Sequence, residues 1–327
     1  MSQPPRLFVI ASYMRDVSVA VDQFPLPGET RLGGDSLESH GGKGSNQAVQ
    51  AARCGAAVSL VAALGDDAAG RAAQALWAAE GLDASPAVVR RGAATGLAVI
   101  VVNGQGQNQI VIAPGANASL SPADIDRAQP AVAAACLVLA QLETPLDATL
   151  RAFALARAAG VPTLLNTAPA PSALPAALWA LTDILVANEL EAALLAGQPA
   201  DTDPQVLGAR LLQQVSTAVV ITVGAAGAWL FQAGQGALHC PALPVAVQDS
   251  TGAGDAFVGA FSASWAAQLG PQRALAMGVA AGSLACRQRG VVPALADGAT
   301  IAAALRSAQS GSRHVTGGGP KNSDPSR

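Results

Sequence analysis

Aromatic and charged residues are scarce in this chain of 327 residues. Aromatic side chains make up 3% of the sequence and charged ones 13%, whereas 51% of the residues are hydrophobic. This composition excludes a disordered body and a coiled coil, both of which need many charged residues. The core must therefore be built mainly from Ala, Val and Leu, packed closely between helices and a sheet.

Long hydrophobic runs and clusters of basic residues are also missing. The longest apolar run, from Ala131 to Ala140, is far shorter than the roughly 18 residues that cross a bilayer. No basic segment precedes the apolar residues 7–11, so a secretory signal is not expected either. The net charge of −3 offers nucleic-acid phosphates no continuous basic surface. The sequence thus predicts a soluble cytoplasmic protein without nucleic-acid or membrane partners.

Cysteine, histidine and lysine are few and widely separated. The chain has three histidines, and no Cys-x-x-Cys spacing occurs among its cysteines, which makes a zinc site or a disulfide framework improbable. The four cysteines are Cys54, Cys136, Cys240 and Cys286. Lysine occurs only at Lys43 and Lys321, so Lys43 is the one lysine expected in the folded body.

Short apolar runs alternate with helix-like stretches along most of the chain. The predicted strands are Leu7–Ile10, Val58–Leu64, Cys136–Leu139, Thr163–Leu165, Ile184–Val186 and Val219–Val223. The predicted helices are Gly44–Cys54, Ala68–Glu80, Leu146–Ala159, Glu189–Leu195 and Val206–Gln214. Such alternation predicts an α/β fold in which a mostly parallel sheet carries helices on both faces.

Two segments, about residues 16–37 and 95–113, interrupt this alternation. Ser18–Phe24 and Arg31–Leu37 have short alternating patterns, and Gly96–Val102 and Gln109–Ala113 flank a turn with two glycines. These segments predict a small second sheet. We expect one domain over residues 1–310 and a disordered tail over 311–327, which lacks apolar periodicity.

Residues 41–48, of sequence Gly-Gly-Lys-Gly-Ser-Asn-Gln-Ala, form the first segment with chemical character. Gly42 and its neighbour let backbone amides approach a ligand closely, and Asn46 in the first helical turn can point its amide at the same place. A Walker A loop is excluded, because Leu37 and Gly44 stand where that motif needs Gly and Ser or Thr. The alternative is a glycine turn with an incidental lysine, which the isolation of Lys43 makes less probable.

The second segment, residues 249–257, has the sequence Asp-Ser-Thr-Gly-Ala-Gly-Asp-Ala-Phe. It follows the strand-like Val245–Val247 and opens a predicted helix over Ala256–Ala267, whose N-terminal amides could bind an anion while Asp255 takes a proton from a hydroxyl. Phe257 stands where a dinucleotide-binding motif needs a third glycine. The alternative, a helix merely capped by Asp255, does not explain the adjacent Gly-Ala-Gly.

These two segments resemble the two signatures of the ribokinase (PfkB) family of sugar kinases, and the order of motifs matches over about residues 6–306. The resemblance implies a Rossmann-like α/β domain with a small β-sheet lid, and ATP-dependent phosphorylation of a sugar hydroxymethyl group. It further implies Mg²⁺, a monovalent cation such as K⁺, and a homodimer that pairs through the lid sheets.

The resemblance also assigns roles to individual residues. It implies that Asp255 is the catalytic base and that Gly252, Ala253 and Gly254 form the anion hole. It places the sugar against Asp16, Gly42, Lys43, Asn46, Glu143 and Asp255. It places ATP against Asn188, Thr222, Gly224, Gly227, Gly252 and Gly254.

Metal sites follow from the same resemblance. Asn188 and Glu191 match the residues that organise Mg²⁺ through water, although the same spacing is an ordinary helix capping box. The monovalent cation is assigned to Asp249, Thr251, Gly290 and Ala294. Ribokinases often have Ser at the last of these positions, so this chain could lack one hydroxyl ligand.

Met14 marks a departure near the sugar site, because ribokinases typically have Asn there and deoxyribokinases of the family have Met. A thioether favours an apolar neighbour over a hydroxyl, although Met also fills gaps without any specific role. We therefore expect transfer of the ATP γ-phosphoryl group to O5 of ribose or 2-deoxyribose, with Met14 among the sugar contacts. Kinases of nucleosides, fructose or tagatose phosphate remain alternatives, as does a catalytically silent sugar-binding protein.

Overall fold

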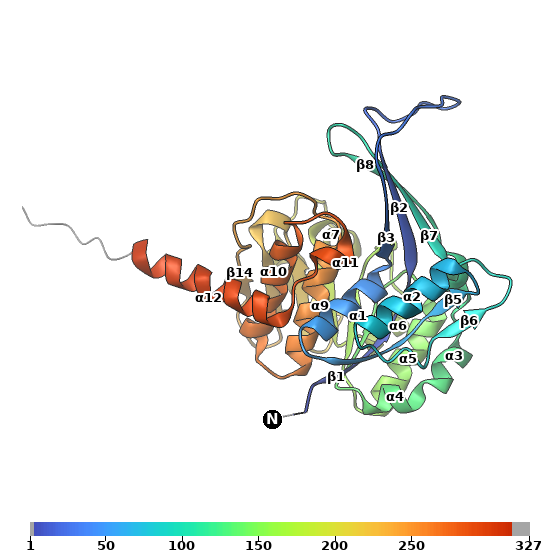
Figure 1. The fold of residues 1–327 in the computed structure, drawn as a ribbon. Helices are drawn as coiled ribbons and strands as arrows, with labels where there is room; N and C mark the ends of the chain where they lie inside the picture. The colour runs from blue at the N-terminus through green and yellow to red at the C-terminus, as the bar shows by residue number, and fades with distance from the viewer. Residues whose placement is uncertain (1–2, 316–327) are drawn as a thin grey trace, which may run out of the picture.

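A central sheet of eight strands organises the computed structural model, which describes residues 3–315 (Figure 1). The strand order is β14-β13-β12-β11-β10-β9-β1-β4, and every neighbouring pair from β4 to β12 is parallel. The two remaining pairs, β12 with β13 and β13 with β14, are antiparallel. The bounds are β1 Arg6–Ile10, β4 Ala57–Val61, β9 Leu137–Ala140, β10 Thr163–Asn166, β11 Ile184–Asn188, β12 Ala218–Thr222, β13 Ala228–Gln232 and β14 Leu238–Cys240. The predicted, mostly parallel sheet is confirmed.

Both faces of the sheet are buried, as the continuous apolar strands predict. In β1, Leu7 and Val9 belong to the core on one face, and Phe8 and Ile10 to the core on the other. The first face is covered by α1 Lys43–Arg53, α2 Ala68–Ala79, α9 Ala253–Ala266, α10 Pro271–Ala285, α11 Val291–Ala294 and α12 Gly298–Val315. The second is covered by α3 Pro122–Arg127, α4 Gln129–Ala134, α5 Leu146–Ala158, α6 Ala176–Leu181, α7 Glu189–Leu195 and α8 Pro204–Leu211.

A second sheet of four strands projects from the edge of the main body (Figure 1). Its order is β3-β2-β7-β8, with β2 parallel to β7 and antiparallel pairs on either side. The bounds are β2 Met14–Ala20, β3 Ser36–Gly41, β7 Gly96–Val102 and β8 Asn108–Ala113. The small second sheet and the hairpin over 96–113 are confirmed.

The strands predicted at 18–24 and 31–37 are misplaced along the sequence. β2 ends at Ala20, and β3 begins only at Ser36. Pro25 and Pro27 offer no backbone N–H to a ladder, and Gly33 and Gly34 favour a turn. The chain between the two strands is therefore a long connection.

Four further elements differ from the prediction in their presence or in where they begin or end. The run expected over 58–64 divides into β4 and β5 Ala63–Gly65, which pairs with β6 Val88–Arg90. Val245–Val247 forms no strand. α9 begins at Ala253, before the predicted start at Ala256, because Gly252 adopts the left-handed conformation and is the N-cap of the helix. α12 continues through residues 311–315, which were expected in the tail, because Ile301 and Leu305 pack its inner face on the core. Residues 316–327 lie outside the described part.

Two short 3-10 turns stand between these elements. η1 Gly115–Ser119 follows β8, and η2 Gly224–Ala226 connects β12 to β13. Within residues 3–315, no helix is long and apolar enough to cross a lipid bilayer.

Candidate active site

The carboxyl ends of five parallel strands gather the polar side chains that the sequence separates. Glu143 follows β9, Asn166 ends β10, Asn188 ends β11 and Thr222 ends β12, while Ser12 follows β1. In an open α/β sheet, the crevice beyond these ends is the usual place for a ligand. The first turns of α1 and α9 enter the same region, so the two glycine-rich segments meet there.

Asp255 lies at the centre of this region, in the first turn of α9, and is 8% exposed. The Asn46 amide nitrogen Nδ2 donates to its Oδ2 at 2.9 Å, and Gln47 Nε2 donates to its Oδ1 at 2.9 Å. The structure therefore brings together Asn46 and Asp255, which the sequence analysis named separately. It adds Gln47, which that analysis did not name as a site residue.

Asn46 carries a buried polar atom that points to a ligand. The side chain is 3% exposed, and its Oδ1 finds no hydrogen-bond partner among the residues that the structure describes. An orphaned buried oxygen is costly unless a ligand or water satisfies it. A sugar hydroxyl that donates to Oδ1, beside the carboxylate of Asp255, would remove that cost.

Gly252 and Gly254, at the start of α9, lie in different surroundings, and the absence of a side chain has a different consequence at each. Gly252 has φ of +78°, and a Cβ there would collide with the side chain of Val291, so only Gly fits. At Gly254, a Cβ would meet no atom within 4 Å, because this residue borders open space. The amide of Ala253 already donates to Ser250 O at 3.2 Å, so Gly254 is the more open part of the predicted anion hole.

The segment before α1 lies against the end of β1. Gly42 has φ of +90°, and a Cβ on it would lie 2.6 Å from the Cα of Tyr13. Gly44 is equally confined, since its Cβ would lie 2.6 Å from Oε1 of Gln141. These glycines allow α1 to begin directly beside the strand ends, which places Lys43 in the crevice.

Three acidic side chains act on the charge of Lys43, of which Asp255 is buried and Glu143 and Glu191 are half-buried. Glu143 Oε2 accepts from Ser12 Oγ at 2.6 Å and from the Lys43 backbone N–H at 2.9 Å. Burial alone would lower the pKa of the Lys43 ammonium, but the carboxylates of Asp255, Glu143 and Glu191 together raise it. Lys43 therefore remains a cation within the crevice.

Asp16 is the acidic side chain that the environment perturbs most clearly. Burial, followed by the nearby charges of Glu143 and Asp255, raises the pKa of Asp16 to about 7. Met14 is 3% exposed and lies two residues earlier on β2, between Gly41 of β3 and Gly96 of β7. Because side chains alternate along a strand, Met14 and Asp16 share one face of β2.

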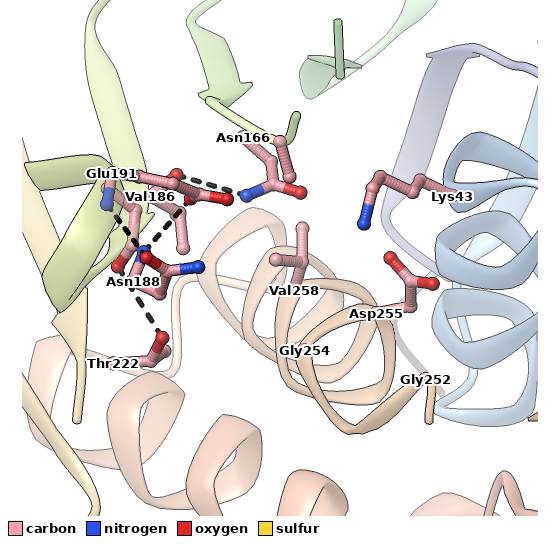
Figure 2. A pocket seen from close by; sticks show the side chains of 12 residues that line it. Lys43, Asn166, Val186, Asn188, Glu191, Thr222, Gly252, Gly254, Asp255 and Val258 are labelled. Atoms are coloured by element: carbon pink, nitrogen blue, oxygen red, sulfur yellow. Dashed lines mark hydrogen bonds between the residues drawn. The ribbon is translucent and has the colours of Figure 1, made fainter. Parts of the chain in front are cut away.

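Two adjoining cavities open beside these residues and share Thr222 and Gly254. The smaller, of about 130 Å³, is polar, and Figure 2 shows Lys43 and Asp255 pointing toward each other within it. Its polar side chains are Lys43, Asn166, Asn188, Glu191, Thr222 and Asp255. The larger, of about 580 Å³, is mainly apolar and includes Gly224, Gly227, Phe257, Val279 and Gly282. A lysine cation and side chains that can donate hydrogen bonds suit a phosphate group, and a mainly apolar cavity suits a nucleotide base.

Asn188 and Glu191 form the capping box that their spacing indicates. Asn188 Oδ1 accepts from the Glu191 N–H at 2.8 Å, and Glu191 Oε2 accepts from the Asn188 N–H at 3.0 Å. Both residues also line the smaller cavity (Figure 2). The capping and ligand-binding interpretations of this pair are therefore compatible.

The residues predicted to hold a monovalent cation come together only in part. Asp249 Oδ1 accepts from the Thr251 N–H at 2.9 Å and Oδ2 from the Gly290 N–H at 3.4 Å, so Asp249 links the two loops. Ala294, on α11, contributes no side-chain oxygen. Over residues 3–315 there is no cluster of three or more His, Cys, Asp or Glu side chains that could hold a metal. A cation here would therefore depend largely on backbone carbonyls.

Four polar side chains that hold this site together were not predicted from the sequence: Ser12, Gln47, Gln141 and Asn166. Gln47 could have been suspected, because two consecutive amide side chains near the start of a helix are unusual among the Ala-rich helices of this chain. Ser12, Gln141 and Asn166 each lie just after or at the end of a strand, and only the sheet order shows that these ends are neighbours.

Comparison with known proteins identifies the family. The sequence model of the pfkB family of carbohydrate kinases matches residues 5–308. The chain belongs to this family. The kinase is therefore a phosphotransferase that acts on a sugar alcohol group, and its fold is the ribokinase fold.

Individual relatives agree with this assignment. The kinase is 39% identical to ribokinase from Mus musculus over 258 residues, which cover 78% of this chain and 80% of the mouse protein. It is 34% identical over 256 residues to deoxyribokinase from Salmonella typhi, covering 78% and 83% of the two chains. The structure of Arabidopsis thaliana ribokinase complexed with ribose and ATP superposes with a TM-score of 0.86 at 30% identity, covering 93% of this chain and 99% of that one.

Proposed function

We propose that this kinase transfers the γ-phosphoryl group of ATP to O5 of a pentose, either D-ribose or 2-deoxy-D-ribose. The observation that carries the proposal is the position of the Asp255 carboxylate at the start of α9. It accepts hydrogen bonds from the side-chain amides of Asn46 and Gln47, and it lines the smaller cavity together with Lys43. Relatives named ribokinase and deoxyribokinase, and a similar structure that holds ribose and ATP, support the pentose and the donor.

Asp255 acts as the general base in this proposal. It accepts the proton of the O5 hydroxyl as O5 forms a bond to the γ-phosphorus, while the bond from that phosphorus to the bridging oxygen of ADP breaks. Lys43 and the N-terminal amides of α9, chiefly at Gly254, stabilise the charge on the transferring group. Asp16, Gly42, Lys43, Asn46 and Glu143 orient the sugar, with Asn46 Oδ1 accepting a hydrogen bond from one of its hydroxyls.

Mg²⁺ fits the oxygen donors of the smaller cavity. Asn188 and Glu191 would hold it through water, where the ion would neutralise charge on the ATP phosphates. Thr222, Gly224 and Gly227 line the larger cavity, which we assign to the rest of the nucleotide. We also assign a monovalent cation to the loops of Thr251 and Gly290, with weaker ligation because Ala294 lacks a hydroxyl.

We further propose a homodimer that pairs through the four-stranded sheet. β8 exposes Ile110, Val111 and Ile112, with fractional exposures of 50%, 70% and 46%, and such a strand tends to pair or pack. Sedimentation velocity would test the oligomeric state. The four cysteines are free thiols, and together with the use of ATP they support a cytoplasmic location.

The experiment that tests the function is an ATP-consumption assay with a panel of sugars. Ribose and 2-deoxyribose should be phosphorylated, whereas nucleosides, fructose and tagatose phosphate should be poor substrates. Turnover of a nucleoside in preference to either pentose would contradict the proposed substrate. Sugar binding without ATP consumption would instead identify a silent sugar-binding protein.

The role of Asp255 gives a sharper prediction. Asp255→Asn should bind the pentose with nearly unchanged affinity but lower kcat by about 10²–10⁴-fold, which is the usual cost of losing a general base. Calorimetry of sugar binding and steady-state kinetics measure the two effects. A variant with near-native kcat would show that another group accepts the proton.

A further inference from the structure

Gln47 makes a direct hydrogen bond to the proposed catalytic base, yet it lies outside the residues that the sugar and nucleotide require. It is fully buried near the start of α1, and its Nε2 lies 2.9 Å from Oδ1 of Asp255. Asn46 Nδ2 lies 2.9 Å from the other oxygen, Oδ2. Each carboxylate oxygen thus receives one donor, which fixes the rotation of the carboxylate and leaves each oxygen a lone pair for a substrate proton.

The orientation of the Gln47 amide is determined by its other partners. Gln141 Nε2 donates to Gln47 Oε1 at 2.6 Å, and Gln47 Nε2 donates a second hydrogen bond to Asn166 Oδ1 at 3.0 Å. An inverted amide would place Oε1 against two acceptors and its nitrogen against a donor. Only one orientation satisfies all the partners, and in that orientation Gln47 donates to Asp255.

The same partners anchor Gln47 to the central sheet. Gln141 directly follows β9, Asn166 ends β10, and Asn166 Nδ2 donates to Val186 O of β11 at 3.1 Å. These are three neighbouring parallel strands. These hydrogen bonds connect the Asp255 carboxylate to the central sheet as well as to its own helix.

We propose that Gln47 is a positioning residue for phosphoryl transfer: with Gln141 and Asn166 behind it, it holds the Asp255 carboxylate in the orientation that accepts the proton of the sugar hydroxyl. The proposal rests on the proposed role of Asp255. Displacement of a reacting group by about 1 Å can cost on the order of 100-fold in rate. Gln47 therefore acts on the rate of the chemical step and not on substrate affinity.

Gln47→Leu tests this, with Gln50→Leu as a matched control. Gln50 is the same residue type, one turn further along the same helix, equally buried, and bonds Ala296 O at 2.8 Å instead of Asp255. We expect Gln47→Leu to lower kcat by about 10- to 100-fold, with the KM for sugar and ATP within about threefold of native. Gln50→Leu should keep native kcat even where both variants lose similar thermal stability.

Combination with Asp255→Asn separates a positioning role from an independent one. If Gln47 acts through Asp255, the variant carrying both substitutions should be no slower than Asp255→Asn alone. Independent losses that multiply would overturn the proposal, as would equal losses of kcat in Gln47→Leu and Gln50→Leu. If Gln47→Leu does not fold, Gln47→Met is judged by the same criteria, because its flexible side chain fills the same volume without polar atoms.

These outcomes are distinct from failure of the proposed function. An active Asp255→Asn variant would show that Asp255 is not the general base, and the proposed catalytic role would fail. An inactive Asp255→Asn variant with a fully active Gln47→Leu variant would leave the base in place and overturn only the positioning role.

Discussion

At the scale of single residues, Met14 is the side chain from which we expect the strongest effect on which sugar the proposed site accepts. It is buried, stands at the start of β2, and shares a face with Asp16, which lies two residues further along that strand. A thioether accepts hydrogen bonds only weakly, so a sugar hydroxyl packed against it would lose its partner. Selectivity between ribose and 2-deoxyribose should therefore depend on this one position.

We expect 2-deoxyribose to be used at least as well as ribose, and Met14→Asn to shift the preference toward ribose. An unpaired buried hydroxyl costs about 1–3 kcal/mol, which corresponds to roughly 5- to 150-fold in relative kcat/KM. Steady-state kinetics on both sugars measure the ratio, and Met14→Leu, which keeps an apolar side chain of similar size, should leave it unchanged. A native enzyme that favours ribose more than tenfold, with the same ratio in Met14→Asn, would show that Met14 does not contact C2.

Site residues can be predicted from the sequence where the backbone requires glycine and the functional side chains stand next to it in the same segment. Gly252 and Gly42 need positive φ, and both stand in contiguous segments with Asp255 and Asn46, so each segment could be recognised by itself. Gln47 could not be assigned in this way. Its partners lie 94, 119 and 208 residues away, and an amide gains its role only from the groups that folding places around it.

At the scale of elements, β2 connects the crevice to the four-stranded sheet. Its first residues lie beside the proposed sugar site, and the strand pairs with β3 and β7 along its length as it extends away from the central sheet (Figure 1). The hairpin of β7 and β8 was predictable because a turn with two glycines separates two alternating runs. β3 was misplaced because only Gly41 among its six residues is buried, so burial imposes little pattern on its sequence.

Sugar binding should close this sheet over the crevice and exclude water from the reacting groups. Hydrogen exchange in residues 96–113, which form β7, β8 and their turn, should slow when saturating pentose is added. Exchange in β10 and β11, within the buried central sheet, provides the internal control and should not change. Unaltered exchange in residues 96–113 at saturation would count against a moving lid.

At the scale of the whole molecule, the burial of Asp16 near two other carboxylates should make stability depend on pH. The folded chain raises the pKa of Asp16 from 3.8 to about 7, mainly by burial. Between these values the folded chain binds more protons than the unfolded chain, so the free energy of unfolding falls as pH rises. This contribution is fully present below about pH 4 and is lost as pH rises through about 7.

Asp16→Asn removes this titration and should flatten that part of the profile. Denaturant unfolding of the sugar-free native chain and of the variant, at intervals from pH 4 to pH 8, measures the difference between their free energies of unfolding. That difference should increase steadily in favour of the variant as pH rises. Parallel profiles for the two proteins would show that Asp16 titrates near its ordinary value.

The residues of the site divide between two sheets, and this division bears on how such an enzyme can change. Asp255, Asn46 and Gln47 belong to helices packed on the central sheet, whereas Met14 and Asp16 belong to β2 of the smaller sheet. If these residues have the roles proposed above, exchanges in β2 should alter which sugar is accepted while the groups proposed to transfer the phosphoryl group keep their places. New substrate preferences can therefore be acquired by lineages, or by protein engineers, through a few substitutions in one strand while the catalytic machinery is inherited intact.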